Sequence, residues 1–149
     1  MNLDHVFKKT KTALKKSEST TTVPDGLLCR CSRCKKPILV QEVRDAYYIC
    51  PKCGGYFKVR AYERIRRVAD EGTFQESDRD LVGENPLGFE GYEEKLAAER
   101  LKTRMKEAIV TGTGSIDGIP AALGVMDSRF MMASMGWAVG EKLTRLIEK

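Results

Sequence analysis

Hydrophobic and polar residues follow different patterns in successive parts of the chain. Residues 1–26 are rich in Lys, Ser and Thr and end in VPDG, which predicts a basic flexible tail. Residues 27–60 contain short β-prone runs between cysteines, namely PILVQEV, AYYIC and YFKVR. This second part is therefore predicted to form a small β module.

A helical period of apolar residues begins after the cysteines. The first predicted helix covers residues 61–71 and can end at Gly72. Its apolar face consists of Tyr62, Ile65, Val68 and Ala69. A second helix is predicted over residues 90–106, after a turn-rich stretch. It is amphipathic through Tyr92, Leu96 and Met105, and the fit to the helical period is weaker around Leu101. Residues 61–106 are thus expected to be a helical connector.

After the second helix the period changes from helical to β. Two β-prone runs in EAIVTGTGSIDGIPAALGVMDSRF flank Asp117-Gly118, a pair that favours a tight primed turn. Residues 108–127 are therefore predicted to form a β-hairpin.

The last segment, SMGWAVGEKLTRLIEK, predicts a helix that begins near Ser134, whose hydroxyl can cap the first turn. Its buried stripe is predicted to consist of Val139, Leu143, Leu146 and Ile147. The helix follows the hairpin as the last predicted element. This helix has little sheet to cover, so we expect further polypeptide to complete the core, as in a fragment of a longer chain.

Composition adds few restrictions on the class of protein. The 149 residues are 42% hydrophobic and 32% charged, which is ordinary for a soluble globular protein. No apolar run approaches the roughly 20 residues that span a bilayer, and the N-terminal residues lack the apolar core of a secretory signal. A cytoplasmic protein without a membrane segment is expected, and a cysteine cluster there indicates metal binding before disulfides.

Positive charge is concentrated in the N-terminal part of the chain. Residues 1–60 contain 13 Lys or Arg and 5 Asp or Glu, a net charge of +8. Residues 61–149 contain 13 and 16, a net charge of −3. An anionic partner of the basic part is one interpretation, and a solvated basic tail is the other.

Four of the five cysteines form the strongest chemical motif. Two C-x-x-C pairs separated by 15 residues match the pattern of a zinc ribbon. Each pair folds into a tight knuckle whose two sulfurs face one point, and Pro51, Gly54 and Gly55 suit the turn of the second knuckle. The predicted metal ligands are Cys31, Cys34, Cys50 and Cys53.

The fifth cysteine, Cys29, and the single histidine, His5, are not predicted to bind the metal. Cys29 could replace Cys31 only through a C-x₄-C arm, which forms a tight knuckle less readily, so it is interpreted as a small buried thiol. Four thiolates leave no coordination position for water or substrate. One structural zinc ion is therefore predicted, and not a catalytic one.

The ribbon alone leaves its function open. Basic zinc ribbons often bind nucleic acid, because Lys and Arg contact phosphates and aromatic side chains stack on bases. The aromatic residues in question are Tyr47, Tyr48, Tyr56 and Phe57, which would equally cover a small metal core. An accessory part of an enzyme and a protein docking surface are the other interpretations.

Three stretches read together resemble one family: CSRCKKPILVQEVRDAYYICPKCGGYFKVRAYERIRRVADEGTFQE, NPLGFEGYEEKLAAERLKTRMKEA and EAIVTGTGSIDGIPAALGVMDSRFMMASMGWAVGEKLTRLIE. From about Pro24 onward the chain resembles the N-terminal part of the carboxyltransferase beta subunit of bacterial acetyl-CoA carboxylase. The resemblance implies that the four predicted ligands hold zinc. It also implies that the start of a crotonase-like α/β domain, a spiral of ββα turns, follows the ribbon and the helical connector. Residues 107–149 would be its first, incomplete ββα turn, and the chain would be truncated.

The resemblance implies transfer of a carboxyl group from carboxybiotin on a carrier protein to acetyl-CoA, which gives malonyl-CoA for fatty acid synthesis. The implied partners are the carboxyltransferase alpha subunit, in an alpha2beta2 heterotetramer, the biotin carboxyl carrier protein and biotin carboxylase. The resemblance places Ser134, Met135 and Gly136 beside the acyl-CoA, where a helix N-terminus offers free N–H donors. An ordinary capped helix after a tight turn is the other interpretation of this loop. No catalytic residue of the family is matched, so the chain alone is expected to be inactive.

The sequence departs from the family in this loop. The family usually has two glycines before the serine, and Met132 and Ala133 stand in their place. Trp137 replaces a residue that is usually small. A Cβ at both glycine positions narrows the approach between backbone and ligand.

Overall fold

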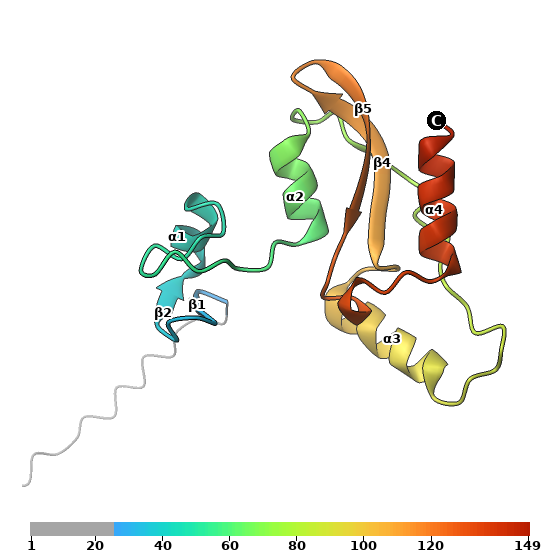
Figure 1. The fold of residues 1–149 in the computed structure, drawn as a ribbon, viewed down its shortest axis with the longest axis horizontal. Coiled ribbons are helices and arrows are strands. Elements are labelled where there is room, and N and C mark those ends of the chain that lie inside the picture. The colour runs from blue at the N-terminus through green and yellow to red at the C-terminus, as the bar shows by residue number, and fades with distance from the viewer. Residues whose placement is uncertain (1–25) are drawn as a thin grey trace, which may run out of the picture.

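The computed structural model describes residues 26–149, so His5 and residues 1–25 of the predicted tail lie outside the described part. Two groups of elements follow one another (Figure 1), and we call residues 27–60 the cysteine module and residues 61–149 the α/β body. The module contains β1 (Leu28–Arg30), β2 (Pro37–Leu39) and α1 (Val40–Asp45). The body contains α2 (Ala61–Val68), β3 (Gln75–Ser77), α3 (Tyr92–Thr103), β4 (Ile109–Ile116), β5 (Ile119–Met126), the 3-10 helix η1 (Met131–Ala133) and α4 (Trp137–Ile147).

The cysteine module is built on two short antiparallel pairings. β1 pairs with β2, with Cys29 opposite Ile38, and an isolated bridge joins Ile49 to Tyr56. The run PILVQEV, expected to be β throughout, changes to helix α1 after its first three residues. The helix directs the side chain of Val43 into the buried cluster that Ile38 and the cysteines form. Burial of this side chain therefore overrides the β propensity of the run.

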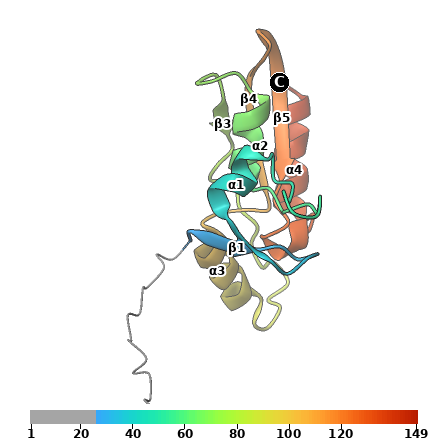
Figure 2. The same cartoon turned by 90° about the vertical axis from the view of Figure 1, so that its left-hand side faces the viewer.

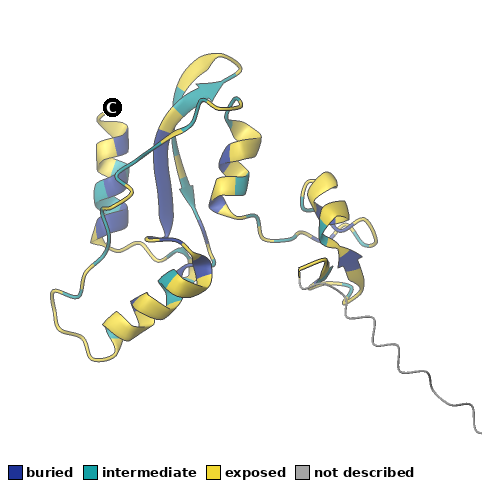
Figure 3. Ribbon diagram, turned by 180° about the vertical axis from the view of Figure 1, so that it is seen from behind, coloured by how far each residue is buried: buried dark blue, intermediate teal, exposed yellow. Residues whose placement is uncertain are grey.

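The α/β body is a three-stranded antiparallel sheet, in the order β3-β4-β5, between two helices. α2 packs on one face of the β4–β5 hairpin and α4 on the other, as Figures 1 and 2 show. Figure 3 shows that buried residues are concentrated on the first half of β4 and on parts of the helices. The hairpin is therefore the centre of the body.

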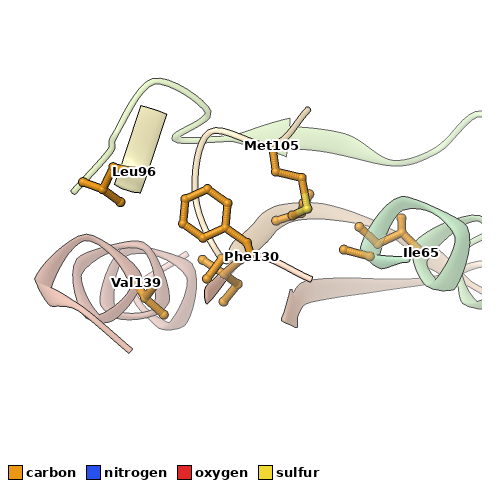
Figure 4. Close-up of a cluster of buried hydrophobic side chains, with 9 residues drawn as sticks. Ile65, Leu96, Met105, Phe130 and Val139 are labelled. Atoms are coloured by element: carbon orange, nitrogen blue, oxygen red, sulfur yellow. The ribbon is translucent and has the colours of Figure 1, made fainter. Parts of the chain in front are cut away.

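One hydrophobic core joins the elements of the body. Figure 4 shows the labelled side chains that come together from α2, α3, α4 and the segments beside the hairpin. The buried members are Ala61, Ile65, Leu96, Met105, Ala108, Ile109, Val110, Phe130 and Val139. None of these residues belongs to the cysteine module, so the core of the body forms without side chains from the module.

Both helices predicted for the connector exist, but they are shorter than expected. α2 ends at Val68, and Ala69 is already extended. α3 ends at Thr103 because Arg104 adopts a left-handed conformation with a φ of 57°. Met105 is buried, as the prediction requires, although it lies beyond the helix.

The predicted hairpin is confirmed, and a distant carboxylate holds its turn. Asp117 and Gly118 have positive φ values of 51° and 78°, as a type I′ turn requires. Both backbone N–H groups donate to the carboxylate of Asp70, at 3.0 and 2.8 Å. Strand β3, in a stretch predicted as turns, pairs with the other edge of β4. Opposite β3, a Cβ on Gly112 would lie 2.6 Å from the Phe74 ring, so only glycine fits there.

The start of α4 differs from the prediction. The helix begins at Trp137 and not near Ser134, and no side chain caps it. The Ser134 hydroxyl instead donates to the backbone carbonyl of Met131 at 2.7 Å, because η1 bends the chain before the helix. Ile147 of the predicted buried stripe is 82% exposed, since it lies in the last turn beyond the sheet-facing side.

Three consecutive residues before α4 have left-handed backbone conformations. The φ values are 42° at Met131, 56° at Met132 and 61° at Ala133. A residue with a Cβ is strained here by about 1 kcal/mol or more, because the Cβ approaches the following carbonyl oxygen. The backbone therefore favours glycine at Met132 and Ala133, the two positions at which the family named in the sequence analysis usually has glycine.

Replacing Met132 or Ala133 with glycine is expected to stabilise the chain by up to about 1 kcal/mol, because relief of the strain exceeds the entropy that glycine adds to the unfolded chain. Urea-induced unfolding measures the effect. Ala98→Gly, on an exposed part of α3, is the matched control and should destabilise the chain by about 1 kcal/mol. If Met132→Gly and Ala133→Gly destabilised the chain as Ala98→Gly does, the backbone at residues 132 and 133 would not be strained.

Candidate metal centre and neighbouring cavities

Both C-x-x-C segments fold into knuckles of the same construction. The residue after the second cysteine, Lys35 or Gly54, donates its N–H to the carbonyl of the first cysteine at 2.9 Å in both knuckles. Lys35 and Gly54 both have positive φ, 59° and 67°. Gly55 does not, contrary to expectation. A Cβ there would instead lie 3.1 Å from the Cβ of Arg33, so close packing between the knuckles favours glycine.

The four predicted ligands lie around one point. Their Sγ atoms are all within 4.8 Å of one another. The Sγ of Cys31 is 3.7 Å from that of Cys53, and the Sγ of Cys34 is 3.9 Å from that of Cys50. Four sulfurs at the usual Zn–S length of about 2.3 Å are about 3.8 Å apart in a tetrahedron. The donor set therefore fits one tetrahedral ion with every position taken.

Backbone donors and burial shift the thiol pKa values in opposite directions. The N–H of Cys34 lowers the pKa of Cys31 to about 6, so this sulfur is ready to bind as a thiolate. The N–H of Gly55 acts in the same direction on Cys53, but burial and the neighbouring sulfurs outweigh it and raise that pKa to about 11. An incoming metal ion must therefore displace a proton from Cys53.

Cys29 stands outside this group of sulfurs. It is half-buried, and its Sγ lies 3.6 Å from the carbonyl oxygen of Ile38 across the β1–β2 pair. Burial raises the pKa of the Cys29 thiol. The side chain packs against the buried cluster of the cysteine module as a small apolar group.

The aromatic residues of the cysteine module divide into two pairs. Tyr48 and Phe57 pack against the cysteines, whereas Tyr47 and Tyr56 are 75% and 80% exposed. The guanidinium of Arg67 on α2 lies 5.2 and 5.3 Å from the ring centroids of Tyr47 and Tyr48. It also donates to a backbone carbonyl of α1 at 2.9 Å. This side chain attaches the cysteine module to the body.

A cavity of about 450 Å³, which we call the basic groove, lies between the module and the body. Its charged lining residues are Arg44, Lys58, Arg60, Glu63, Arg66, Arg104 and Arg129. Arg66 pairs with Glu63, and Arg129 pairs with Asp127. The other four cations form no ion pair with any residue between 26 and 149, so the groove has an excess of positive charge.

Two further cavities flank η1 and the start of α4. Ser134, Met135 and Gly136 all line the first, which has a volume of about 340 Å³. The second has a volume of about 670 Å³, and its basic lining residues are Lys58, Lys95, Lys102 and Arg129. The first backbone bond of α4 runs from the N–H of Gly140 to the carbonyl of Gly136, so the N–H groups of the first turn have no acceptor within the helix.

A buried carboxylate that the sequence analysis did not single out joins α2 to the end of the hairpin. Asp127 is 1% exposed and accepts the N–H of Ala61, the first residue of α2, at 2.9 Å. The guanidinium of Arg129 donates to it at 2.6 Å. Burial opposes ionisation, but these donors hold the pKa of Asp127 below its usual range. An acid and a base two residues apart, directly after an apolar strand, are the sequence signal that could have indicated this pair.

The geometry defines a class of protein: a four-cysteine module of the zinc-ribbon kind, joined to an α/β body that ends in a ββα unit. Over 144 residues the chain is 49% identical to the acetyl-coenzyme A carboxylase carboxyl transferase subunit beta of Carboxydothermus hydrogenoformans, covering 96% of this chain and 51% of that protein. The same subunit of Desulforamulus reducens is 43% identical over 152 residues, covering 97% and 53%. No family model matches the chain.

The chain therefore belongs to the family of acetyl-coenzyme A carboxylase carboxyl transferase beta subunits and corresponds to their N-terminal part. This confirms the resemblance noted in the sequence. The chain spans about half the length of these curated relatives. A protein of Natranaerobius thermophilus named as subunits beta/alpha is 50% identical over 126 residues, which are 85% of this chain and 21% of that protein.

Among solved structures, transcarboxylase 12S with methylmalonyl-coenzyme A and methylmalonic acid bound gives a TM-score of 0.49 at 24% identity, over 61% of this chain and 16% of that one. The same protein with hydrolysed methylmalonyl-coenzyme A gives 0.49 at 22% identity. The predicted order, a four-cysteine β module followed by an α/β region, is confirmed. Among residues 26–149, no helix has the length and apolar character that crossing a membrane requires.

Proposed function

We propose that this chain is the zinc-bearing part of a carboxyl transferase that acts on acetyl-CoA. The observation that carries the proposal is its 49% identity, over nearly the whole chain, to a carboxyl transferase beta subunit. The proposed ion is a single zinc held by the four clustered cysteines. Because four thiolates leave no position for water or substrate, the ion holds the module together and takes no part in the chemistry.

The reaction sets demands on the site at the start of α4. The acetyl methyl group must lose a proton and its carbon must attack a carboxyl carbon, while negative charge grows on the thioester oxygen. Carboxybiotin would supply the carboxyl group. The bond between that carboxyl carbon and the biotin nitrogen breaks, and the nitrogen ends with the proton that the methyl group loses. We propose that Ser134, Met135 and Gly136 contact the acyl end of acetyl-CoA through their backbone, because they line a cavity in front of free N–H groups.

The adjoining cavity of about 670 Å³ suits the phosphates of coenzyme A. Four basic side chains line it, against the single carboxylate of Glu99, which pairs with Lys102. The side chain of Arg129 is held in place by Asp127. Lys58 comes from the cysteine module and the others come from the body. In this proposal the zinc-loaded module contributes a cation to coenzyme A binding, which gives the structural ion a role in substrate affinity.

We further propose the partners that family membership implies. These are an alpha subunit, in an alpha2beta2 heterotetramer, a biotin carboxyl carrier protein and biotin carboxylase, all in the cytoplasm. The relative named as subunits beta/alpha supports the pairing with an alpha subunit. Because the chain spans about half of its relatives' length, we propose that by itself it does not catalyse the transfer.

Gly136→Ala tests the proposed contact in a complete subunit bound to its alpha partner. Gly136 has an ordinary φ of −83°, and an added Cβ would meet no heavy atom within 4 Å. The fold should therefore tolerate alanine, whereas a closely bound acyl group would not, and we expect the affinity for acetyl-CoA to fall about tenfold. Isothermal titration and the KM measure this effect.

Gly140→Ala is the matched control for this test. Gly140 lies inside α4, and a Cβ there also meets nothing within 4 Å. This change should leave acetyl-CoA affinity unaltered and stabilise the helix by about 0.5 to 1 kcal/mol. Unchanged affinity in Gly136→Ala, with the fold intact, would remove Gly136 from the proposed contact.

The basic groove favours nucleic-acid binding as a second candidate function. Four of its cations lack an ion pair among the described residues, and the rings of Tyr47 and Tyr56, elsewhere on the cysteine module, are exposed. Binding of a single-stranded RNA probe should weaken steeply with salt and be lost when the exposed lysines of the module are changed to glutamine. These are Lys35, Lys36, Lys52 and Lys58, of which Lys58 lines the basic groove and the other three lie outside it.

Fluorescence anisotropy at several salt concentrations measures this second function. Lys95→Gln and Lys149→Gln, on the body, are controls that should leave RNA affinity nearly unchanged. Binding that ignores both salt and the four lysines of the module would contradict the nucleic-acid hypothesis.

A further inference from the structure

A buried lysine on α4 lines a small polar cavity in the α/β body. Lys142 is 2% exposed, although lysine is almost never fully buried without a partner. The cavity has a volume of about 20 Å³ and is also lined by the carboxylates of Glu76 and Glu107. Within the part of the chain that the structure describes, no ion pair or hydrogen bond joins the Lys142 ammonium to another side chain.

An ammonium group on a buried side chain is unfavourable without an acceptor, and the Nζ of Lys142 itself remains accessible to water although the residue is 2% exposed. The three N–H groups of Lys142 need acceptors, and the nearest carboxylates act on it from beyond ion-pair distance. Burial lowers the pKa of Lys142, and Glu107 and Glu76 oppose that shift through their charge. The lysine and the carboxylates thus face the same small space without touching.

The two carboxylates are partly bonded already. Glu107 accepts the N–H of Gly83 at 2.8 Å and the N–H of Ala108 at 2.9 Å. Glu76 accepts the hydroxyl of Tyr62 at 3.0 Å. Each carboxylate has about four acceptor positions, so both can accept another donor from the cavity.

The lining carries charges of both signs, because Arg79, Arg104 and Lys106 line the cavity together with Lys142, Glu76 and Glu107. A cation would meet four positive charges and an anion would meet the two carboxylates, and the bromide soak described below separates a water from an anion. A water molecule can accept from the ammonium and donate to both carboxylates, and the cavity has room for about one. We propose that one ordered water is bound there and bridges the Nζ of Lys142 to the carboxylates of Glu107 and Glu76.

This water would connect α4 to the wall of the cavity at its own N-terminus. Glu107 holds the backbone of Gly83, and both residues line the cavity of about 340 Å³ in front of α4. Lys142 would therefore be a positioning residue for that cavity. This last consequence rests on the proposed function, whereas the water site does not.

A crystal structure of the metal-loaded chain at high resolution tests the site directly. We expect a water within hydrogen-bond distance of the Nζ of Lys142 and of an oxygen of Glu107 or Glu76. Three results would overturn the proposal: a direct Lys142–carboxylate pair in a closed cavity, an ammonium turned out to solvent, or a bromide ion in that position after soaking.

Lys142→Met gives an independent test in solution, because methionine keeps most of the alkyl stem and removes the donor. In the unchanged chain we expect a cross-peak between a long-lived water and the amide proton of Val110, which lines the cavity. The cross-peak should disappear in Lys142→Met and persist in the exposed control Lys102→Met. A cross-peak that survives in a folded Lys142→Met chain, or that is missing from the unchanged chain, would contradict the proposal. If Lys142→Met does not fold, the presence or absence of the water cross-peak in the unchanged chain decides the test.

Discussion

Removal of the metal is expected to unfold residues 27–60 and to leave residues 61–149 folded. The module is too small to be stable through its apolar core alone, and structural zinc contributes about 10 to 16 kcal/mol of binding free energy to such modules. The core of the body contains no side chain from the module, so it should persist. The buried hydrophobic residues of the module are Cys31, Ile38, Val43 and Cys50, of which two are predicted ligands.

Cys50→Ser should reproduce the effect of a chelator, because it removes a buried sulfur from the group of four. Zinc content and the dispersion of amide chemical shifts measure the result. Cys29→Ser is the matched control, since its sulfur lies outside the group, and it should retain one zinc ion and a folded module. Intact chemical-shift dispersion for residues 27–60 after loss of zinc would refute the structural role of the metal.

Asp127→Ala is expected to lower the free energy of unfolding by about 3 to 5 kcal/mol, as loss of one partner from a buried pair does. The change leaves the guanidinium of Arg129 without its carboxylate and the N–H of Ala61 without its acceptor. α2 has no side-chain cap of its own, so Asp127 supplies that acceptor from a distant segment.

Urea-induced unfolding monitored by circular dichroism measures this loss. Asp80→Ala is the matched control, because Asp80 is also paired with a lysine, Lys106, but lies at the surface. The control should change stability little. Equal effects of the two substitutions would contradict the buried role of Asp127.

The carboxylate of Asp127 should also make the free energy of unfolding depend on pH in the acidic range. The pKa of Asp127 in the folded chain lies below its ordinary value of about 3.9, so the unfolded chain binds the proton more readily. Its contribution is present above about pH 4 and is lost as the pH falls through the folded pKa. Thermal unfolding between pH 6 and 2 should therefore show a weaker acid dependence for Asp127→Asn than for the unchanged chain.

Features that depend on neighbouring residues could be predicted from the sequence. The turn at Asp117-Gly118 needs two residues that tolerate positive φ, and both are adjacent in the chain. Each C-x-x-C knuckle likewise closes within a few residues, so the spacing indicated which cysteines could meet. The exclusion of Cys29 follows from the same local geometry.

Features that depend on packing were missed or misplaced. Ser134 has the right residue type for a helix cap, but η1 takes its hydroxyl to Met131 and the helix begins later. Ile147 has the right spacing for a buried stripe, but no sheet lies over it. Lys142 occupies a buried position on α4 that a hydrophobic pattern assigns to solvent.

By itself, the sequence determined the four clustered sulfurs, the hairpin and the family, because each depends on residue types at short, regular spacings. Only the tertiary structure decided which polar groups from distant segments meet. It brought Asp127 to the start of α2, Glu107 to Gly83, and Lys142 to a cavity beside two carboxylates. These contacts depend on how the helices pack on the two faces of the sheet. The spacing of residues along the chain does not indicate which distant segments this packing brings together.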